Sequence, residues 1–279
     1  MPELPEVERA RRLAASVADD RVIKQVTCAR DTIVFDSVTP RTMQRSLVGR
    51  RVLAVRRKGK QLWFELDDQP MPLFHLGMAG AIRTPMATPL RLVSHGQRAM
   101  ETDWPPRWMK ILIKFDDGGE LAMTDQRRFG RIRLRKDPPA EPPISELGFD
   151  PLLDLPPRHE FRDLLFARRG NIKGVLLDQS FAAGVGNWIA DEVLYQAGID
   201  PRRRVGDLSE TEAGRIRAAL KRIIETAVRV NAEKPRFPKT WLFHHRWGRN
   251  AEAITARGER IEHLKIAGRT TAWVPTAQS

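Results

Sequence analysis

Cysteine is nearly absent from the sequence, and this scarcity excludes two kinds of stabilisation. Cys28 is the only cysteine among 279 residues, so an internal disulfide and any zinc site with two or more thiolate ligands are excluded. Six histidines remain, and counting alone leaves a histidine and carboxylate metal site open. No apolar run reaches the roughly 18 residues of a membrane-spanning helix. The first twenty residues carry many charges and no apolar centre, so no secretory signal is expected.

Positive charge is what the sequence has in excess. Lys and Arg number 48 against 35 Asp and Glu, which gives a formal net charge of +13. Such a surplus predicts a polyanionic partner, nucleic acid first and a membrane surface second, although basicity that serves only solubility is the alternative. Residues 201–279 hold 17 basic and 8 acidic residues, so the C-terminal third is expected to bind phosphates most strongly.

The hydrophobic periodicity changes along the chain and predicts two structural parts. Residues 1–18 have apolar side chains at helical spacing after two early prolines, which predicts a helix. From 21 to 135, short segments rich in β-branched and aromatic residues alternate with turn residues, which favours a sandwich or barrel. Residues 84–108 are expected to be an irregular insertion, and the proline-dense stretch 136–157 an interdomain linker.

The second part is mainly helical. Helices are expected at 160–170, 172–179, 187–198 and 210–230. Gly170 is expected to end the first of them, and Ser209 with Glu212 forms a capping box that opens the last. Residues 231–249 are expected to be a loop, and 251–275 a β-hairpin.

The N-terminus is the most distinctive chemical group. Removal of Met1 before the small residue Pro2 would leave a secondary amine, and an α-amino group has a useful neutral fraction near pH 7. Such an amine can attack a sugar C1′ and form a Schiff base without a metal. Glu3 could move protons, and Glu6 on the same helical face could hold the geometry. A helix start with two capping acids explains the same residues without any chemistry.

The opening MPELPEVE resembles the start of the formamidopyrimidine-DNA glycosylase family, which are bifunctional base-excision repair enzymes. Further segments resemble the family in the same order along nearly the whole chain: RRKGKQLWFEL at 56–66, HLGMAG at 75–80, TDQRRFG at 124–130, LGFDPL at 147–152, GVGNWIADEVLYQAGIDP at 184–201 and GRTTAWVP at 268–275. The resemblance implies an α+β protein of two domains, with duplex DNA between them. The expected parts are an N-terminal β-sandwich domain with an N-terminal helix at 1–135, the linker at 136–157, a helix–two-turn–helix domain at 158–240 and a β-hairpin finger at 241–279.

The resemblance also implies the roles of individual residues. The catalytic group would be Pro2, Glu3, Lys60 and Arg269, supported by Glu6 and Glu192. Lys60 is preferred to Lys58 because KQLWFEL keeps the family's spacing to the following strand. The space left by an everted nucleotide would be filled by Met78, Arg127 and Phe129, since extruding a base removes its stacking and pairing. Further DNA contacts would come from His75, Arg128, Lys173 and Asn187. Taken singly, each of these side chains also fits a core, capping or solvated position.

The chain departs from the best-known members, which close the finger with four cysteines on zinc. It resembles the zincless-finger branch, typified by plant and fungal members, in which hairpin pairing and the packing of Trp241, Phe243 and Trp273 would replace the metal. No metal or other cofactor is therefore expected, and the adjacent His244 and His245 make a poor ligand pair. Gln126 stands where the family usually has proline.

The predicted function is excision of damaged purines from duplex DNA, followed by strand cleavage through β,δ-elimination. Residues 231–240 form a short segment where other members have a loop that closes over the everted purine. Ring-opened formamidopyrimidines, hydantoins and abasic sites are therefore favoured over 8-oxoguanine. The alternatives are the sister type that removes oxidised pyrimidines, and a non-catalytic module that binds DNA lesions. A monomer without membrane association is expected, in the nucleoid of a bacterium or the nucleus of a eukaryote.

Overall fold

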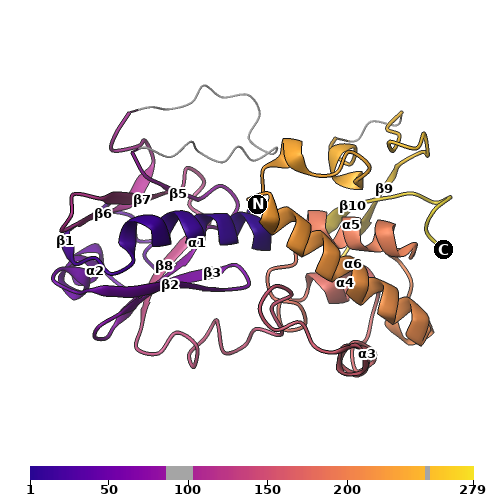
Figure 1. Cartoon of the computed structure of the whole chain (residues 1–279), viewed down its shortest axis with the longest axis horizontal. Helices are drawn as coiled ribbons and strands as arrows, with labels where there is room; N and C mark the ends of the chain where they lie inside the picture. Colours follow the sequence, from indigo (N-terminus) through magenta and orange to yellow (C-terminus); the bar gives the residue numbers. More distant parts are fainter. Residues whose placement is uncertain (86–102, 249–251) are drawn as a thin grey trace. The chain divides into compact units, whose positions relative to one another are not determined.

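The computed structural model describes residues 1–85, 103–248 and 252–279. It divides into two compact units, Met1–Glu146 and Leu147–Ser279 (Figure 1). The division falls inside the predicted linker 136–157, where the chain forms turns and no helix or extended strand. Most of the predicted insertion 84–108 lies outside the described residues. The bounds of the four predicted parts stay predictions.

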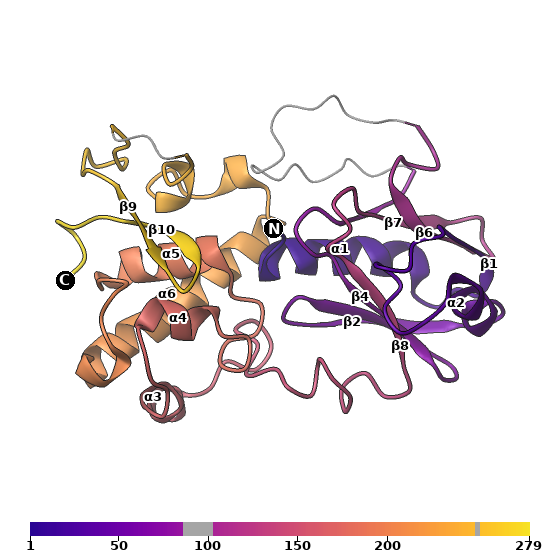
Figure 2. The same ribbon diagram turned by 180° about the vertical axis from the view of Figure 1, so that it is seen from behind.

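Two antiparallel four-stranded sheets form the first unit, in the orders β1-β6-β7-β5 and β2-β3-β4-β8. The strands are β1 Ile23–Cys28, β2 Val52–Lys58, β3 Gln61–Leu66, β4 Met71–His75, β5 Ala81–Arg83, β6 Met109–Phe115, β7 Glu120–Thr124 and β8 Arg131–Arg135. The view from behind shows β4 beside β8 (Figure 2). Apolar side chains from both sheets share one core, as in a β-sandwich. The predicted sandwich is confirmed. The segments expected as strands were 22–29, 51–57, 61–67, 110–116, 120–124 and 131–135, and they correspond to every strand except β4 and β5.

Two helices complete this core. Helix α1 (Leu4–Ala18), which the sequence predicts, contacts the edge strands β2 and β5 of the two sheets and so covers one open side (Figure 1). Helix α2 (Pro40–Leu47) was not predicted. Its N-cap Thr39 accepts a hydrogen bond from Thr42 N, and Met43 and Leu47 are buried. The expectation that 21–135 consists of strands, turns and an insertion therefore missed this helix.

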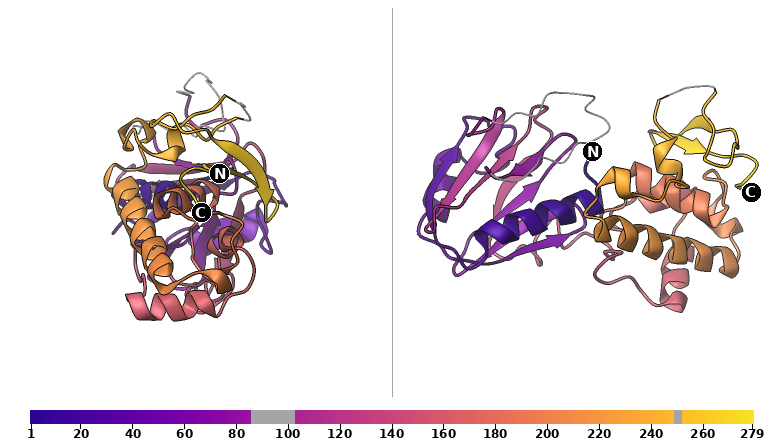
Figure 3. Two further views of the ribbon diagram at one scale, coloured as in Figure 1. Left: turned by 90° about the vertical axis from the view of Figure 1, so that its right-hand side faces the viewer. Right: turned by 45° about the horizontal axis from the view of Figure 1, so that its top comes forward.

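The second unit contains the predicted helices. They are α3 Arg158–Phe166, α4 Ile172–Leu177, α5 Asn187–Ala197 and α6 Glu210–Arg229, with short 3-10 turns η2 Val205–Asp207, η3 Lys234–Arg236 and η4 Leu242–His244. Helix α6 lies alongside α5 (Figure 3). The capping box of Ser209 with Glu212 is confirmed at the start of α6. Helix α3 ends at Phe166, four residues before Gly170, so the predicted glycine cap is wrong.

The finger is a hairpin of β9 (Glu262–Ile266) and β10 (Arg269–Trp273). Its turn residues Ala267 and Gly268 both have positive φ, 47° and 73°, which matches the twist of a two-residue hairpin turn. An aromatic cluster packs beside it, formed by Trp188, Phe237, Trp241 and Phe243. The packing predicted for Trp241 and Phe243 is confirmed. Trp273 is not part of this cluster, and its ring centroid lies 4.4 Å from Cζ of Arg202.

No helix in the described part of the chain is long and apolar enough to cross a membrane. Among the same residues, no group of three or more His, Cys, Asp or Glu side chains is placed to hold a metal ion. The absence of a cofactor stays a prediction.

Candidate functional site

The N-terminal amine precedes a helix cap made by two buried acids. Glu3 is the N-cap of α1 and Glu6 is its third residue, and the two form a reciprocal capping box. The Glu3 backbone N donates to Glu6 Oε2 at 3.1 Å, and both side chains are 3% exposed. Pro2, which is also buried, stands directly before this cap. Glu3 and Glu6 therefore do cap the helix, and the cap holds the Glu3 carboxylate next to Pro2, the predicted nucleophile.

A buried ion pair links α1 to the β2–β3 hairpin. Arg57, whose side chain is 1% exposed, donates from Nε to Glu8 Oε2 at 3.1 Å and from Nη1 to the Gly59 carbonyl at 2.9 Å. Burial opposes ionisation of Glu8, but hydrogen bonds and charge from Arg11 and Arg57 hold the pKa of its carboxyl below the ordinary value. Sequence reasoning missed this pair. The signal was the period of two along β2, which puts Arg57 on the same face as the core residue Val55.

Lys60 lies in the two-residue turn at the end of that hairpin. Gly59 takes a positive φ of 56°, and Lys58 pairs with Gln61 across the turn. Gln61 in turn pairs with His75 at the end of β4. The N-terminal end of α1, the Lys60 turn and His75 are therefore gathered at one end of the sandwich.

His75 is held in its neutral form. Burial first, then the charges of Lys60, Arg133 and Arg131, lower its pKa to about 4. Its Nδ1 accepts a hydrogen bond from Gly77 N at 3.2 Å, which leaves the proton on Nε2. If this side chain contacts a phosphate, as predicted, it does so as a neutral N–H donor and not as a cation.

The β4–β5 and β7–β8 loops bring together the three residues predicted to fill the space of an everted nucleotide. Gly77 has φ 59°, and a Cβ there would lie 2.5 Å from Gly130 N, so the two loops are pressed together. Met78 follows in the first loop. In the second, Arg127 stacks over the Phe129 ring at 5.0 Å, and Phe129 is 49% exposed. This exposure rules out a core role for Phe129.

A buried carboxylate shapes the β7–β8 loop. Asp125 is fully buried and accepts hydrogen bonds from Arg127 N at 3.0 Å and from Gly130 N at 2.6 Å. The loop is thus fixed by its own first residue, whatever stiffness proline would have given at Gln126. An aspartate two residues before an exposed turn is a recognisable signal for this arrangement, and sequence reasoning had passed over it.

Arg128 is a half-exposed arginine whose orientation is fixed by the Asp31 carboxylate. It adopts φ 59°, and its Nε and Nη2 both donate to Asp31 at 3.0 Å. Asp31 also accepts from Lys110 Nζ at 2.7 Å. These bonds outweigh burial and keep the pKa of the Asp31 carboxyl well below its usual range. One positive charge remains over the three side chains, which suits the predicted phosphate anchor.

In the second unit, Asn187 and Arg269 are brought together by strand β10. Asn187 is the first residue of α5, and Gly186 occupies the N-cap, so the capping alternative for Asn187 is wrong. Its Nδ2 donates to the Thr270 carbonyl at 2.8 Å, and its buried Oδ1 has no hydrogen-bond partner in the described chain. Arg269, next to Thr270, is exposed. The predicted phosphate contacts thus share one surface of this unit.

Lys173 requires a correction. Its side chain is fully buried and forms an ion pair with Asp191, and its Nζ also donates to the Asn187 carbonyl at 3.3 Å. A cation enclosed in this way does not present its charge to DNA, so the predicted phosphate or lesion contact does not fit the structure.

Asp191 is the centre of a charge network that sequence reasoning missed. Besides Lys173, it accepts from Arg246 Nε at 3.1 Å and from Ala272 N at 3.2 Å, both at Oδ2. The side chains of Asp191 and Arg246 are 0% and 6% exposed. One carboxylate therefore joins α4, α5, the segment after η4 and strand β10 of the finger.

Glu192, predicted as a supporting residue, faces the interior. Burial raises its pKa to about 7. Its carboxylate accepts from Gln196 Nε2 at 2.7 Å and from Phe243 N at 2.8 Å. Glu192 therefore supports the segment around Phe243, which leads into the finger.

Comparison with known proteins bears on this arrangement. Residues 1–132 match the family model of the formamidopyrimidine-DNA glycosylase N-terminal domain, and residues 147–238 match that of its H2TH domain. The chain belongs to the formamidopyrimidine-DNA glycosylase family. The predicted family, the two-domain fold and the assignment as an enzyme of this class are confirmed.

Relatives within the glycosylase family cover the chain from end to end. A formamidopyrimidine-DNA glycosylase of Arabidopsis thaliana is 42% identical over 278 residues, 100% of this chain and 71% of that protein. One from Moorella thermoacetica is 32% identical over 97% of this chain and 89% of its own length.

Solved structures of the family agree with the fold. The Lactococcus lactis enzyme bound to DNA with an AP site has a TM-score of 0.80 at 26% identity, covering 99% of both chains. MutM in complex with DNA containing carbocyclic 8-oxo-G has a TM-score of 0.79 at 26% identity, covering 100% of both.

Proposed function

We propose that this protein is a bifunctional DNA glycosylase and AP lyase that removes ring-opened or oxidised purines from duplex DNA through the amine of Pro2. The observation that carries the proposal is the buried Glu3–Glu6 cap directly after Pro2, at the end of the sandwich that also holds the Lys60 turn. Family members bound to an AP site and to carbocyclic 8-oxo-G in DNA support the same chemistry.

In the proposed reaction the Pro2 nitrogen attacks C1′ of the damaged nucleotide, and the bond from C1′ to the base breaks. The base leaves with a proton, and the C1′–N bond becomes an iminium after the sugar ring opens. Removal of a C2′ proton expels the 3′ phosphate, and a second elimination expels the 5′ phosphate. Water then releases the sugar fragment. Glu3 would transfer the protons, and Lys60 would stabilise the negative charge nearby.

Both units would contribute contacts to the damaged duplex. In the first unit, His75 would donate from Nε2 and Arg128 would carry positive charge. In the second, Asn187 and Arg269 would bind the backbone. Extruding a base costs a few kcal/mol, because its stacking and pairing are lost. The gap in the base stack would be occupied by Met78, Arg127 and Phe129, whose contacts recover part of that cost.

Borohydride trapping on an abasic duplex tests the nucleophile. The wild-type chain without Met1 is expected to give a covalent adduct, and Pro2→Gly combined with Glu3→Gln is expected to give almost none. Gln at position 3 keeps an oxygen for the helix cap, so loss of trapping would report chemistry and not unfolding. Glu210→Gln, at the exposed start of α6, is the matched control. Intact mass establishes whether Met1 is removed. An undiminished adduct from the double variant would overturn the mechanism.

The preferred substrates are proposed to be formamidopyrimidines, hydantoins and abasic sites. Phe237, which lies within the segment 231–240, is 2% exposed and packs in the aromatic cluster. Anchoring at this point supports a segment too short to close over an everted purine. A panel of duplexes with single lesions tests this, and faster excision of oxidised pyrimidines than of purines would favour the sister type. We also propose that the protein acts as a monomer, in the nucleoid of a bacterium or the nucleus of a eukaryote.

A further inference from the structure

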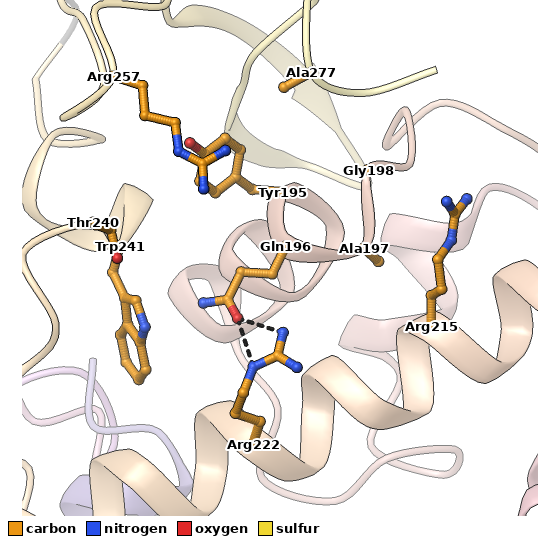
Figure 4. Close-up of a pocket in the computed structure, with 10 residues that line it drawn as sticks. All are labelled: Tyr195, Gln196, Ala197, Gly198, Arg215, Arg222, Thr240, Trp241, Arg257 and Ala277. Atoms are coloured by element: carbon orange, nitrogen blue, oxygen red, sulfur yellow. Dashed lines mark hydrogen bonds between the residues drawn. The ribbon is translucent and has the colours of Figure 1, made fainter.

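A pocket of about 550 Å³ opens at the C-terminal end of α5. Tyr195, Gln196 and the following two residues come from that helix and its cap, and Arg215 and Arg222 come from α6. Trp241 and Arg257 come from the chain that precedes the β9–β10 hairpin (Figure 4). The volume is in the range of sites for small ligands, roughly 300–1,000 Å³.

The described lining of this pocket carries three arginines and no carboxylate. Within the described residues, Arg222 donates to the amide of Gln196 and not to an acid. Glu259, two residues from Arg257, accepts hydrogen bonds from Tyr195 and Thr255. Arg215 has only a long contact, 3.7 Å, to Glu212, whose carboxylate is already bonded to Arg203 and Ser209. The three arginines of the lining thus outnumber the carboxylate bonded to it, and this excess of positive charge attracts anions.

Gln196 holds one of these arginines in place without neutralising it. Arg222 donates from Nη2 at 2.8 Å and from Nε at 3.2 Å to Gln196 Oε1 (Figure 4). The other end of the amide, Nε2, donates to the buried Glu192 at 2.7 Å, which fixes which way the amide points. The guanidinium is therefore oriented in advance, and its Nη1 donors stay available for a ligand.

The pocket is separate from the predicted phosphate contacts of the same unit. Asn187 lies in the first turn of α5 and Gln196 in the last. At 1.5 Å per residue these ends are about 13 Å apart along the axis. The arginines of the pocket are therefore not part of the Asn187 and Arg269 surface.

We infer that this pocket is a second anion site, which binds a phosphate group through the guanidinium group of Arg222, while the positive charge of Arg257 elsewhere in the same lining adds to the attraction. Guanidinium geometry matches the oxygens of a phosphate. The phosphate could belong to a free nucleotide or to DNA backbone remote from the lesion. The inference is independent of the chemistry at Pro2.

Titration followed by ¹H–¹⁵N NMR tests the site. Inorganic phosphate, a deoxynucleoside monophosphate and an undamaged duplex are added in turn to the full chain, with sodium chloride at matched ionic strength as reference. The Arg222 Nε–H and the Gln196 side-chain amide are expected to shift saturably. In Arg222→Ala with Arg257→Ala, the affinity is expected to fall at least about tenfold, since charge-assisted hydrogen bonds are lost. Lys221→Ala with Arg229→Ala removes the same charge from exposed positions of α6 and is the control.

The outcomes separate the sources of the phosphate. Shifts with phosphate and nucleotide support a soluble ligand, and shifts with the duplex alone support backbone binding. Shifts that follow ionic strength, or an affinity equally reduced in the control variant, would overturn the inference. Trapping on abasic DNA, measured on the same variants, reports the Pro2 chemistry separately, so failure of one proposal does not imply failure of the other.

Discussion

Replacing Asp191 by asparagine removes a negative charge that pairs with two buried cations. Lys173 and Arg246 both contact this carboxylate, and their side chains are 0% and 6% exposed. An amide can keep one acceptor oxygen, but it supplies no charge and presents an NH₂ group to one of the two cations. The substitution therefore leaves two positive charges facing each other in the interior of the second unit.

The magnitude follows from the burial. Breaking a buried ion pair by removing one partner costs about 3–5 kcal/mol, because the remaining charge is uncompensated. We expect the free energy of unfolding of the second unit to fall by about this amount, with the finger affected first because Asp191 Oδ2 also accepts from Ala272 N. Removing one cation as well, in Asp191→Asn with Lys173→Met, is expected to recover part of the loss, since neighbouring substitutions are not additive.

Urea denaturation followed by tryptophan fluorescence measures this, because Trp188, Trp241 and Trp273 lie in the second unit. Asp163→Asn is the control: it removes a surface ion pair with Arg162, which contributes at most about 1 kcal/mol. A loss in Asp191→Asn no larger than in the control, or strict additivity in the double variant, would refute the idea that this carboxylate anchors the finger by charge.

Three further predictions concern other positions. Gly77→Ala should abolish lesion excision and lower stability, because φ 59° and a Cβ within 2.5 Å of Gly130 N force the two loops apart; single-turnover excision measures it. The His75 ring should stay neutral as the pH is lowered to about 4, and NMR of the ring measures its protonation. The pKa of Glu192 is raised from 4.5 to about 7 in the folded protein, so its contribution to stability is complete below the lower value and is lost as pH rises through the higher one. Denaturation between about pH 5 and pH 8 should show this fall.

Control variants accompany the predictions for Gly77 and Glu192, and a contradicting result is defined for His75. Gly118 also has a positive φ, 85°, and no atom lies within 4 Å of a Cβ placed there. Gly118→Ala should therefore be strained but leave excision intact, and equal losses at the two glycines would contradict the role of loop packing. In Glu192→Gln the decline of stability with pH should shrink, and an unchanged slope would show that another group causes it. A ring that titrates near pH 6.5 would mean that His75 is not enclosed as described.

Local signals in the sequence determined most of the fold. The capping box at Ser209 and Glu212, and the strand alternation through 52–66, were predicted and are present. Such signals work because caps and faces depend on residues within a few positions of each other. The exceptions were short: α2, with a single turn of buried residues at Met43 and Leu47, gives too weak a period to stand out.

The candidate site needed both sources. The motifs named Pro2, Glu3 and Lys60, but the sequence alone left their capping and solvated alternatives open. The structure explains Glu3 as a cap that is also held beside Pro2. It joins the Lys60 turn to α1 through Arg57, which lies in the segment 56–66 but had been given no role.

Tertiary structure alone decided what is buried and what faces outward. The sequence marked Lys173 as a basic residue of a DNA-binding unit, and only the packing of α4 against α5 encloses it beside Asp191. Asn187 meets Thr270, 83 positions away, for the same reason. The sequence by itself determined most helices and strands, the capping box of α6 and the family, because these depend on near neighbours. The partners of the charged residues depend on contacts distant in sequence, which exist only once the chain has folded.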